Sequence, residues 1–318
     1  MSDALSAVLD LLDVQAAASA RFEAAGRWGL SFPQPGQLKI IAALAGHCWV
    51  MLDDAEPIAL GTGDCVLLAG DRAYAAASGP DQQVLPQPAV LPSPWPPIVY
   101  YQTTADGTEP ERTVLVSGQI TLDRYAAGLL LDDLPPAVRI PASSPGQSLA
   151  PVLEMLSAEA AHPDAPGSTT VRRQLTQVLA VHALRAVLAD NPGLSPGWLS
   201  ALADRQIGAA LTAIHDQPEY RWTVAELAHL AAMSRSAFAA RFRELVGSPP
   251  LEYLTNWRMR QAAHTLRTTD HPVARIGAAA GYPVETTFNS TFKRVIGQAP
   301  GRYRREFRAT IGGSAVPG

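Results

Sequence analysis

Cysteine and long apolar stretches are scarce in this chain. Its 318 residues include only two cysteines, Cys48 and Cys65, which we expect to be the free thiols of a cytoplasmic protein. No apolar run reaches the length of about 18 residues that a membrane-spanning helix requires. The first residues, MSDALSAVLDLLDV, are acidic, whereas a secretory signal peptide begins with basic residues. The sequence therefore predicts neither secretion nor membrane insertion.

Recognisable catalytic groups are also lacking. The chain has seven histidines, but no pattern pairs a nucleophile with a base, cradles a phosphate group or clusters metal ligands. We therefore predict that the protein is not an enzyme and that it has no catalytic residues, no cofactor and no metal ion.

Charged residues make up only 17% of the chain, and their two signs are unevenly distributed. Residues 206–310 contain 14 basic and 8 acidic residues, whereas residues 1–205 contain 11 basic and 21 acidic residues. The net charge of −4 therefore divides between a basic C-terminal part and an acidic N-terminal part. A basic segment of this kind favours binding to the phosphate groups of nucleic acid.

The basic part contains an internal repeat. Five residue types recur at one offset of 50 positions, and such a coincidence of uncommon residues marks a duplicated unit. The first set is Phe238, Phe242, Gly247, Pro250 and Tyr253, and the second is Phe288, Phe292, Gly297, Pro300 and Tyr303.

Each copy has the pattern of a helix, a tight turn and a second helix. In the first copy Thr223 and Glu226 form a capping-box pattern, and either Ser234 or Ser236 can cap the second helix. In the second copy Gly281 marks the turn. One continuous helix over 251–268 would join the two copies. This arrangement favours a pair of DNA-binding helix-turn-helix motifs over two ordinary helical hairpins.

Five motifs in this part carry a family resemblance. They are WTVAELA, MSRSAFAARFRELVG-x-P-P, YLTNWRMRQA, VARIGAAAGY and F-x-x-x-FKR-x-x-G-x-x-P-x-x-YR. With them, residues 207–308 resemble the DNA-binding domain of AraC/XylS-type bacterial transcription regulators. The resemblance implies a partner, double-stranded promoter DNA. It does not distinguish an activator, which would also contact RNA polymerase, from a repressor.

The second helix of each motif should enter the major groove, so its solvent-facing residues are the expected DNA contacts. Arg235 is the expected polar base reader of the first helix and Arg243 a phosphate contact, because the two alanines there offer only methyl groups. Asn289 could pair with adenine. Glu285 could accept a hydrogen bond from cytosine N4, or it could be a carboxylate that interacts favourably with the dipole at the N-terminus of the helix. The full set is Arg235, Ser236, Ala239, Ala240, Arg241, Arg243, Glu285, Thr286, Asn289, Ser290, Lys293 and Arg294.

The N-terminal part has a different pattern. Short apolar or alternating runs between residues 22 and 104, separated by turn signals, predict an all-β sandwich or barrel. The segment from Gly46-His47-Cys48-Trp49 to PIALGTGDCVLLAGDRAY resembles the jelly-roll (cupin) domain at the N-terminus of one AraC-type subfamily. This resemblance implies that the domain senses a small-molecule effector of unknown identity.

Five side chains of this domain could line an effector cavity inside the barrel, although residues of these types are more often ordinary core or strand residues. They are Trp28, His47, Trp49, Tyr74 and Tyr101. Metal-bearing cupins bind their ion with paired histidines and a glutamate. Here only His47 lies near the first motif, and Tyr74 stands where a closing histidine would be. A metal-dependent oxygenase or isomerase, and a redox switch on Cys48 or Cys65, are the alternative hypotheses.

The chain between these two parts is predicted to be helical from Pro151 onward. A long helix over 169–190 has apolar residues on more than one face. The N-terminal domain would cover one face and a second copy of the protein the other, so we expect a homodimer, as the resemblance also implies. Seven prolines between Gly79 and Pro97 predict a long loop in place of a central strand.

Together these features predict a multidomain α+β protein. We expect a cupin-like, ligand-sensing jelly roll over 1–145 and a helical linker and dimerisation segment over 146–205. An all-α domain with two helix-turn-helix motifs would follow over 206–310, and a flexible tail over 311–318.

Overall fold

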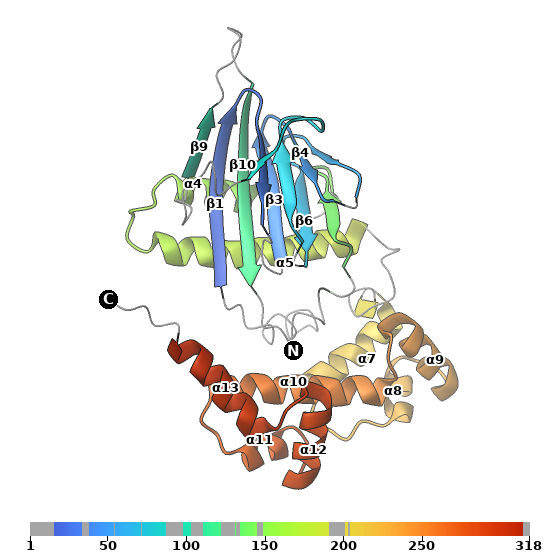
Figure 1. Cartoon of the computed structure of the whole chain (residues 1–318). Helices are drawn as coiled ribbons and strands as arrows, with labels where there is room; N and C mark the ends of the chain where they lie inside the picture. The colour runs from blue at the N-terminus through green and yellow to red at the C-terminus, as the bar shows by residue number, and fades with distance from the viewer. Residues whose placement is uncertain are drawn as a thin grey trace. The chain divides into compact units, whose positions relative to one another are not determined.

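The chain forms two compact units (Figure 1). One contains all the strands together with helices α4 and α5, and the other contains helices α7 to α13. The structure is a computed structural model. It describes residues 16–33, 38–53, 55–70, 72–86, 98–102, 111–121, 131, 134–144, 149–190, 201–202 and 204–313.

The first unit is a sandwich of two β-sheets, which confirms the expected β domain. The larger sheet has the strand order β11-β6-β3-β10-β1-β9 and the smaller one β5-β4-β7-β2-β8. The strands are β1 (Ala16–Ala25), β2 (Gly29–Phe32), β3 (Leu38–Ala45), β4 (Cys48–Met51), β5 (Ile58–Leu60), β6 (Cys65–Ala69), β7 (Tyr74–Ala77), β8 (Leu85–Pro86), β9 (Ile98–Gln102), β10 (Arg112–Thr121) and β11 (Ala137–Ile140).

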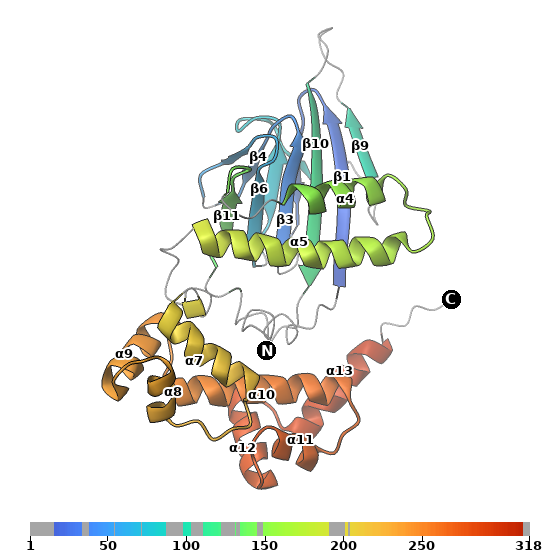
Figure 2. The same ribbon diagram turned by 180° about the vertical axis from the view of Figure 1, so that it is seen from behind.

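Two helices cover the outer face of the six-stranded sheet, as Figure 2 shows: α4 (Ala150–Ala160) and α5 (Ser168–Asp190). Strand β6 is buried at every residue, because one face meets the smaller sheet and the other meets the helices. At Gly118 of β10, an added Cβ would lie 3.0 Å from Thr176 of α5, so glycine permits this close approach. The two helices were expected to form a separate linker, but they belong to the compact unit of the strands.

Asp64 fixes the turn before β6. Its carboxylate accepts hydrogen bonds from the backbone N–H of Gly61 (3.0 Å) and Ala142 (2.9 Å) and from the guanidinium of Arg139 (2.7 Å). Burial opposes ionisation, but these hydrogen bonds prevail and hold the pKa of the Asp64 carboxyl below its usual range. The predicted G-x-G-D turn therefore also anchors the segment that follows β11.

Three strands differ from the expectation. Residues 137–140 lie beyond the runs that predicted strands, yet they form β11 beside β6. The proline-rich stretch contributes β8, which is confined to the edge of the smaller sheet, where a missing N–H is tolerated. The first half of β1 lay outside the predicted strands, but all ten of its residues pair with β10. Residues 87–97 lie outside the described residues.

The second unit is all-α and confirms the two predicted helix-turn-helix motifs. Its helices are α7 (Arg205–Asp216), α8 (Val224–Leu230), α9 (Arg235–Val246), α10 (Pro250–Thr268), α11 (Val273–Ala279), α12 (Glu285–Ile296) and α13 (Pro300–Gly313). The motifs are α8–α9 and α11–α12, and α10 is the continuous helix between them. Helix α13 extends past the predicted boundary at 310.

The repeat residues pack in the same way in both copies. The Phe242 and Tyr253 rings lie 5.8 Å apart, and the Phe292 and Tyr303 rings 5.7 Å. Thr223 and Glu226 form the predicted capping box, and the Ser234 hydroxyl accepts from the N–H of Ala237. After α9 and α12, Gly247 and Gly297 have φ angles of 81° and 88°, a left-handed conformation that favours glycine.

Candidate nucleic-acid interface

Helices α9 and α12 each bury one face and expose the other. Phe238 and Phe242 of α9, and Phe288 and Phe292 of α12, are completely buried. Of the twelve predicted contact residues, Ala239 and Asn289 are half-buried and the other ten are exposed. The predicted contacts therefore lie on the free face of each second helix.

The two helices present different chemistry at equivalent positions. Where α9 has Arg235 and Ala239, α12 has Glu285 and Asn289. The Oδ1 atom of Asn289 has no hydrogen-bond partner among the described residues. This oxygen is buried, so the structure does not present it to solvent.

The cationic side chains fall into two classes. Arg235, Arg243, Lys293 and Arg294 form no ion pair or side-chain hydrogen bond within the described part of the chain, so they are available to phosphates. Arg241 instead pairs with Asp204, whose carboxylate also accepts the first N–H groups of α7. Of the predicted cationic contacts, Arg241 is therefore the one that the chain already uses internally.

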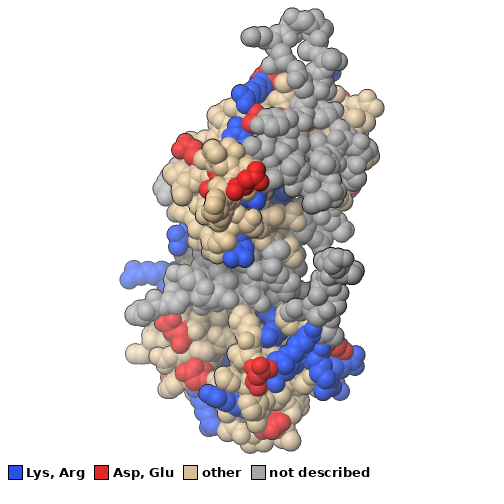
Figure 3. Space-filling view, turned by 90° about the vertical axis from the view of Figure 1, so that its left-hand side faces the viewer, with Lys and Arg blue, Asp and Glu red and all other residues tan. Residues whose placement is uncertain are grey.

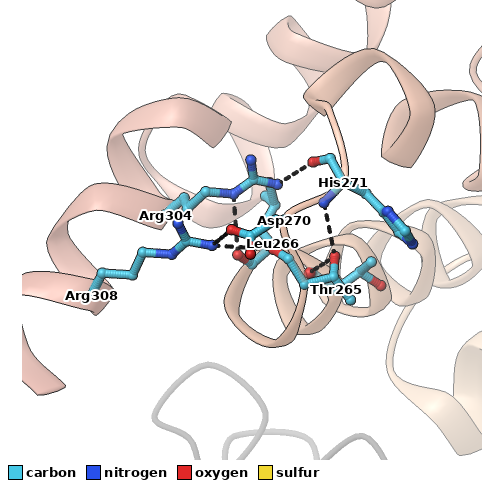
Figure 4. A network of polar contacts seen from close by, with 7 residues as sticks. Thr265, Leu266, Asp270, His271, Arg304 and Arg308 are labelled. Atoms are coloured by element: carbon cyan, nitrogen blue, oxygen red, sulfur yellow. Dashed lines mark hydrogen bonds and ion pairs between the residues drawn. The ribbon is translucent and has the colours of Figure 1, made fainter.

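Two further arginines hold the second motif together (Figure 4). Arg304 of α13 donates to the carbonyls of Leu266 and His271, at and beyond the end of α10. Arg308 donates to the carbonyl of Thr269 and pairs with Asp270. These contacts satisfy carbonyl groups that the end of a helix leaves free. Lys and Arg side chains gather on one face of this unit (Figure 3), but part of the basic charge is structural.

Comparison with known proteins now identifies the chain. A cupin family model matches residues 3–189, and a helix-turn-helix domain model matches residues 227–306. An AraC-like transcription regulator of Streptomyces antibioticus is 39% identical over 309 residues, which cover 95% of this chain and 98% of that protein. The chain belongs to the AraC-like transcription regulators. It is a DNA-binding regulator with a cupin domain, and not an enzyme.

This AraC-like regulator is similar to further known proteins. A second AraC-like transcription regulator, from Streptomyces lividans, is 37% identical over 95% of this chain and 98% of its own length. The DNA-binding domain of AdpA, solved in complex with a target DNA, is 33% identical; the match covers 32% of this chain and 91% of that domain, with a TM-score of 0.31.

The effector residues predicted for the cupin domain do not form one cluster. Trp28 and Tyr74 are buried in the core between the sheets. Trp49 lies between Cys48 and Val50, which both point into that core, so its side chain is on the opposite face of β4. His47 is exposed and pairs with Glu111 at 2.8 Å. Tyr101 lies in β9, but its side chain is outside the described residues.

One residue of this AraC-like regulator was missed by the sequence reasoning. Lys39 of β3 is half-buried and shares its face with Ile41 and Ala43, which line the core between the sheets. Its ammonium group donates to the Ser117 hydroxyl at 3.1 Å. Burial lowers the pKa of Lys39 to about 8. The sequence did contain a signal for this residue, because Lys39 is the single charged residue within the apolar run LKIIAALA.

The alternative hypotheses gain no support in the described part of the chain. No group of three or more His, Cys, Asp or Glu side chains there could hold a metal ion. Burial raises the pKa of both Cys48 and Cys65 to about 12, which leaves little reactive thiolate. Cys48, in β4 of the smaller sheet, belongs to the core between the sheets, whereas Cys65, in β6 of the larger sheet, precedes the core residue Val66 and points away from that core. None of the described helices is both long and apolar enough to span a bilayer.

Proposed function

We propose that this regulator reads promoter DNA through the free faces of α9 and α12. The observation that carries this proposal is the set of exposed, unpaired cations on both helices: Arg235, Arg243, Lys293 and Arg294. Phosphate neutralisation by such side chains supplies much of the affinity for DNA. Asn289, Thr286 and Ser290 of α12 supply the polar contacts to bases, and Ser236, Ala239 and Ala240 of α9 allow close approach.

A direct test is selection of bound DNA from a random pool, followed by methylation interference on the selected site. Two motifs that occupy successive major grooves should give two patches of interference about one helical turn, ~34 Å, apart. A single patch would show that only one motif engages DNA. The absence of any selected duplex at low ionic strength would overturn the proposal entirely.

The cupin domain, in this proposal, binds a small anionic effector. The indole N–H of Trp28 is buried and has no hydrogen-bond partner among the described residues, and such an orphan donor is costly unless a ligand satisfies it. Lys39 adds a half-buried ammonium whose one described partner is the hydroxyl of Ser117. An acceptor-bearing anion would satisfy either group, and it would shift DNA binding if it favoured one arrangement of the protein.

Thermal denaturation with matched ligands tests the effector. A panel of carboxylates from acetate to octanoate, with benzoate, would be compared with the corresponding primary amides, which lack the charge. At least one carboxylate should raise the melting temperature of the wild type more than its amide does, and Lys39→Met should abolish the difference. Equal shifts with acid and amide would contradict an anionic site.

The proposed assembly is a cytoplasmic homodimer. Met155 of α4 and Val171 and Val178 of α5 are exposed apolar side chains on the helical layer, with exposed fractions of 55%, 41% and 43%. Val171 and Val178 are two helical turns apart and share a face. A second copy would cover them. If the regulator is an activator, RNA polymerase is a further partner. Sedimentation of the wild type and of Val178→Glu tests the dimer, because a charge at the interface should yield monomers.

A further inference from the structure

Val284 occupies an unusual position at the start of α12. It is the N-cap residue of that helix, and 55% of it is exposed. It is absent from the hydrophobic cluster that Phe288, Phe292 and Ile296 form beneath the helix. A large apolar side chain thus stands in solvent at the leading end of the second recognition helix.

The repeat provides an internal comparison. The equivalent residue of the first motif is Ser234, whose hydroxyl accepts from the N–H of Ala237 and caps α9. Val284 has no side-chain acceptor, and α12 has no side-chain cap at this position. Serine is among the preferred N-cap residues and valine is among the poorest. The identity of residue 284 therefore costs helix stability and gains no burial inside the chain.

We propose that Val284 is a specificity-determining residue that contacts the 5-methyl group of a thymine. The inference rests on the proposed docking of α12 in the major groove, where N-terminal residues of the recognition helix meet base edges. The thymine methyl is the apolar group that the major groove displays. Valine is branched at Cβ and has one strongly preferred rotamer in many backbone settings, so it presents a fixed apolar surface.

The neighbouring residues fit this role. Glu285 and Thr286 follow Val284 and are also exposed, so one end of α12 offers an apolar, an acidic and a hydroxyl group in succession. Glu285 can accept from cytosine N4 but cannot recognise a thymine, whose edge there carries an acceptor and the methyl group. Val284 thus supplies an apolar contact that Glu285 does not.

The test removes the 5-methyl group of a thymine in the DNA and shortens the Val284 side chain in the protein. After a binding site has been selected, each thymine in the α12 half is replaced singly by deoxyuridine, which lacks only the 5-methyl group. Wild-type affinity should fall about fourfold at one position, the equivalent of ~0.8 kcal/mol for one buried methyl group. Val284→Ala should bind the parent site about fourfold more weakly and lose nothing further at that position.

A second variant separates the role in DNA binding from a role in folding. Val284→Ser should raise the melting temperature, because it restores the cap found in the first motif, and should still lose the thymine preference. The proposal is overturned if no deoxyuridine substitution weakens the wild type, or if the same loss persists in Val284→Ala. Selection of a site by the wild type, with altered selection by Asn289→Ala, would show in that case that α12 still reads DNA and that only the role of Val284 is wrong.

Discussion

Ala232 and Gly281 occupy the same position in the two helix-turn-helix motifs, and both have a positive φ angle, 51° and 85°. Each directly follows the C-cap residue of the first helix. The next residue closes an equivalent hydrogen bond in both motifs, from Met233 to the carbonyl of Ala228 and from Tyr282 to that of Gly277, each at 2.9 Å. The turn therefore begins in the same way in both motifs, although the second is one residue longer, and only the second motif has glycine at the position of positive φ.

Ala232→Gly should stabilise the protein. Alanine at positive φ brings Cβ close to the carbonyl oxygen, at a cost of about 1–2 kcal/mol, and the added freedom of glycine in the unfolded chain offsets part of the gain. We expect a net increase of about 0.5–1 kcal/mol in the free energy of unfolding, measured by urea denaturation.

Gly281→Ala is the matched control for this change. Its Cβ would lie 3.0 Å from the carbonyl oxygen of Glu219 and 3.3 Å from the guanidinium carbon of Arg258, so it should destabilise the protein. If both variants moved stability in the same direction, the positive φ angle would not explain the difference between the turns.

Asp64→Asn should destabilise the sandwich by about 1–3 kcal/mol at pH 7, because hydrogen bonds to a buried charged group are lost. The pKa of the Asp64 carboxyl is lower in the folded state than in the unfolded state, where it is near 3.8. The ionised carboxylate therefore stabilises the fold above pH 3.8, and this stabilisation is lost as the pH falls through the folded-state pKa. Unfolding curves of the wild type and the variant should therefore converge at acid pH. A constant difference between pH 7 and pH 2 would contradict this assignment.

Arg243→Ala should weaken binding to all DNA sequences and reduce the slope of log affinity against log salt by about one unit. Arg243 is exposed and has no described partner, whereas Arg241, two residues away, pairs with Asp204. Arg241→Ala is therefore the control. It should change the salt slope less and the melting temperature more. Equal slopes for both variants and the wild type would exclude Arg243 as a phosphate contact.

Asn289→Ala should relax the preference at a single base pair. Asparagine can pair bidentately with adenine, and the buried Oδ1 of Asn289, which has no hydrogen-bond partner among the described residues, would gain one if the side chain turned toward the groove. Selection from a random DNA pool should recover the wild-type site with one degenerate position, and affinity for the original site should fall by about 1–3 kcal/mol. An unchanged selected sequence would assign base reading in α12 to other residues.

Lys39→Met should raise the melting temperature at pH 7. Burial lowers the pKa of Lys39 from 10.5 to about 8, so the charged form is less favourable in the folded state than in the unfolded state. Between pH 8 and 10.5 the unfolded chain binds more protons, and wild-type stability should rise with pH relative to the variant. A variant that is less stable than the wild type at pH 7 would show that the ammonium is structurally required.

The helix-turn-helix motifs were predictable because their determinants are local. The capping box of Thr223 and Glu226 involves residues three positions apart. Gly247 and Gly297 end their helices through their own backbone angles. The phenylalanines at 238 and 242 share a face because of helical periodicity alone. Each signal acts within one or two turns of the chain, so the sequence contains all the information needed.

The sandwich and its candidate effector residues depended on pairing between distant strands. The alanine-rich segment Ala16–Ala25 has little intrinsic strand preference, and it is a strand because β10 supplies its hydrogen bonds. Trp49 points away from Trp28 because of the pleat of β4 and its register with β7, which composition does not reveal.

What the sequence determined by itself was the family, the duplicated DNA-binding motifs and the two-part organisation, since local caps, periodicity and charge encode them. Only the tertiary structure decided which individual side chains form ion pairs within the chain. Arg241 and Arg243 are alike in sequence, but Asp204, 37 positions from Arg241, pairs with Arg241 and not with Arg243. A cation's availability depends on which distant carboxylate the fold brings to it.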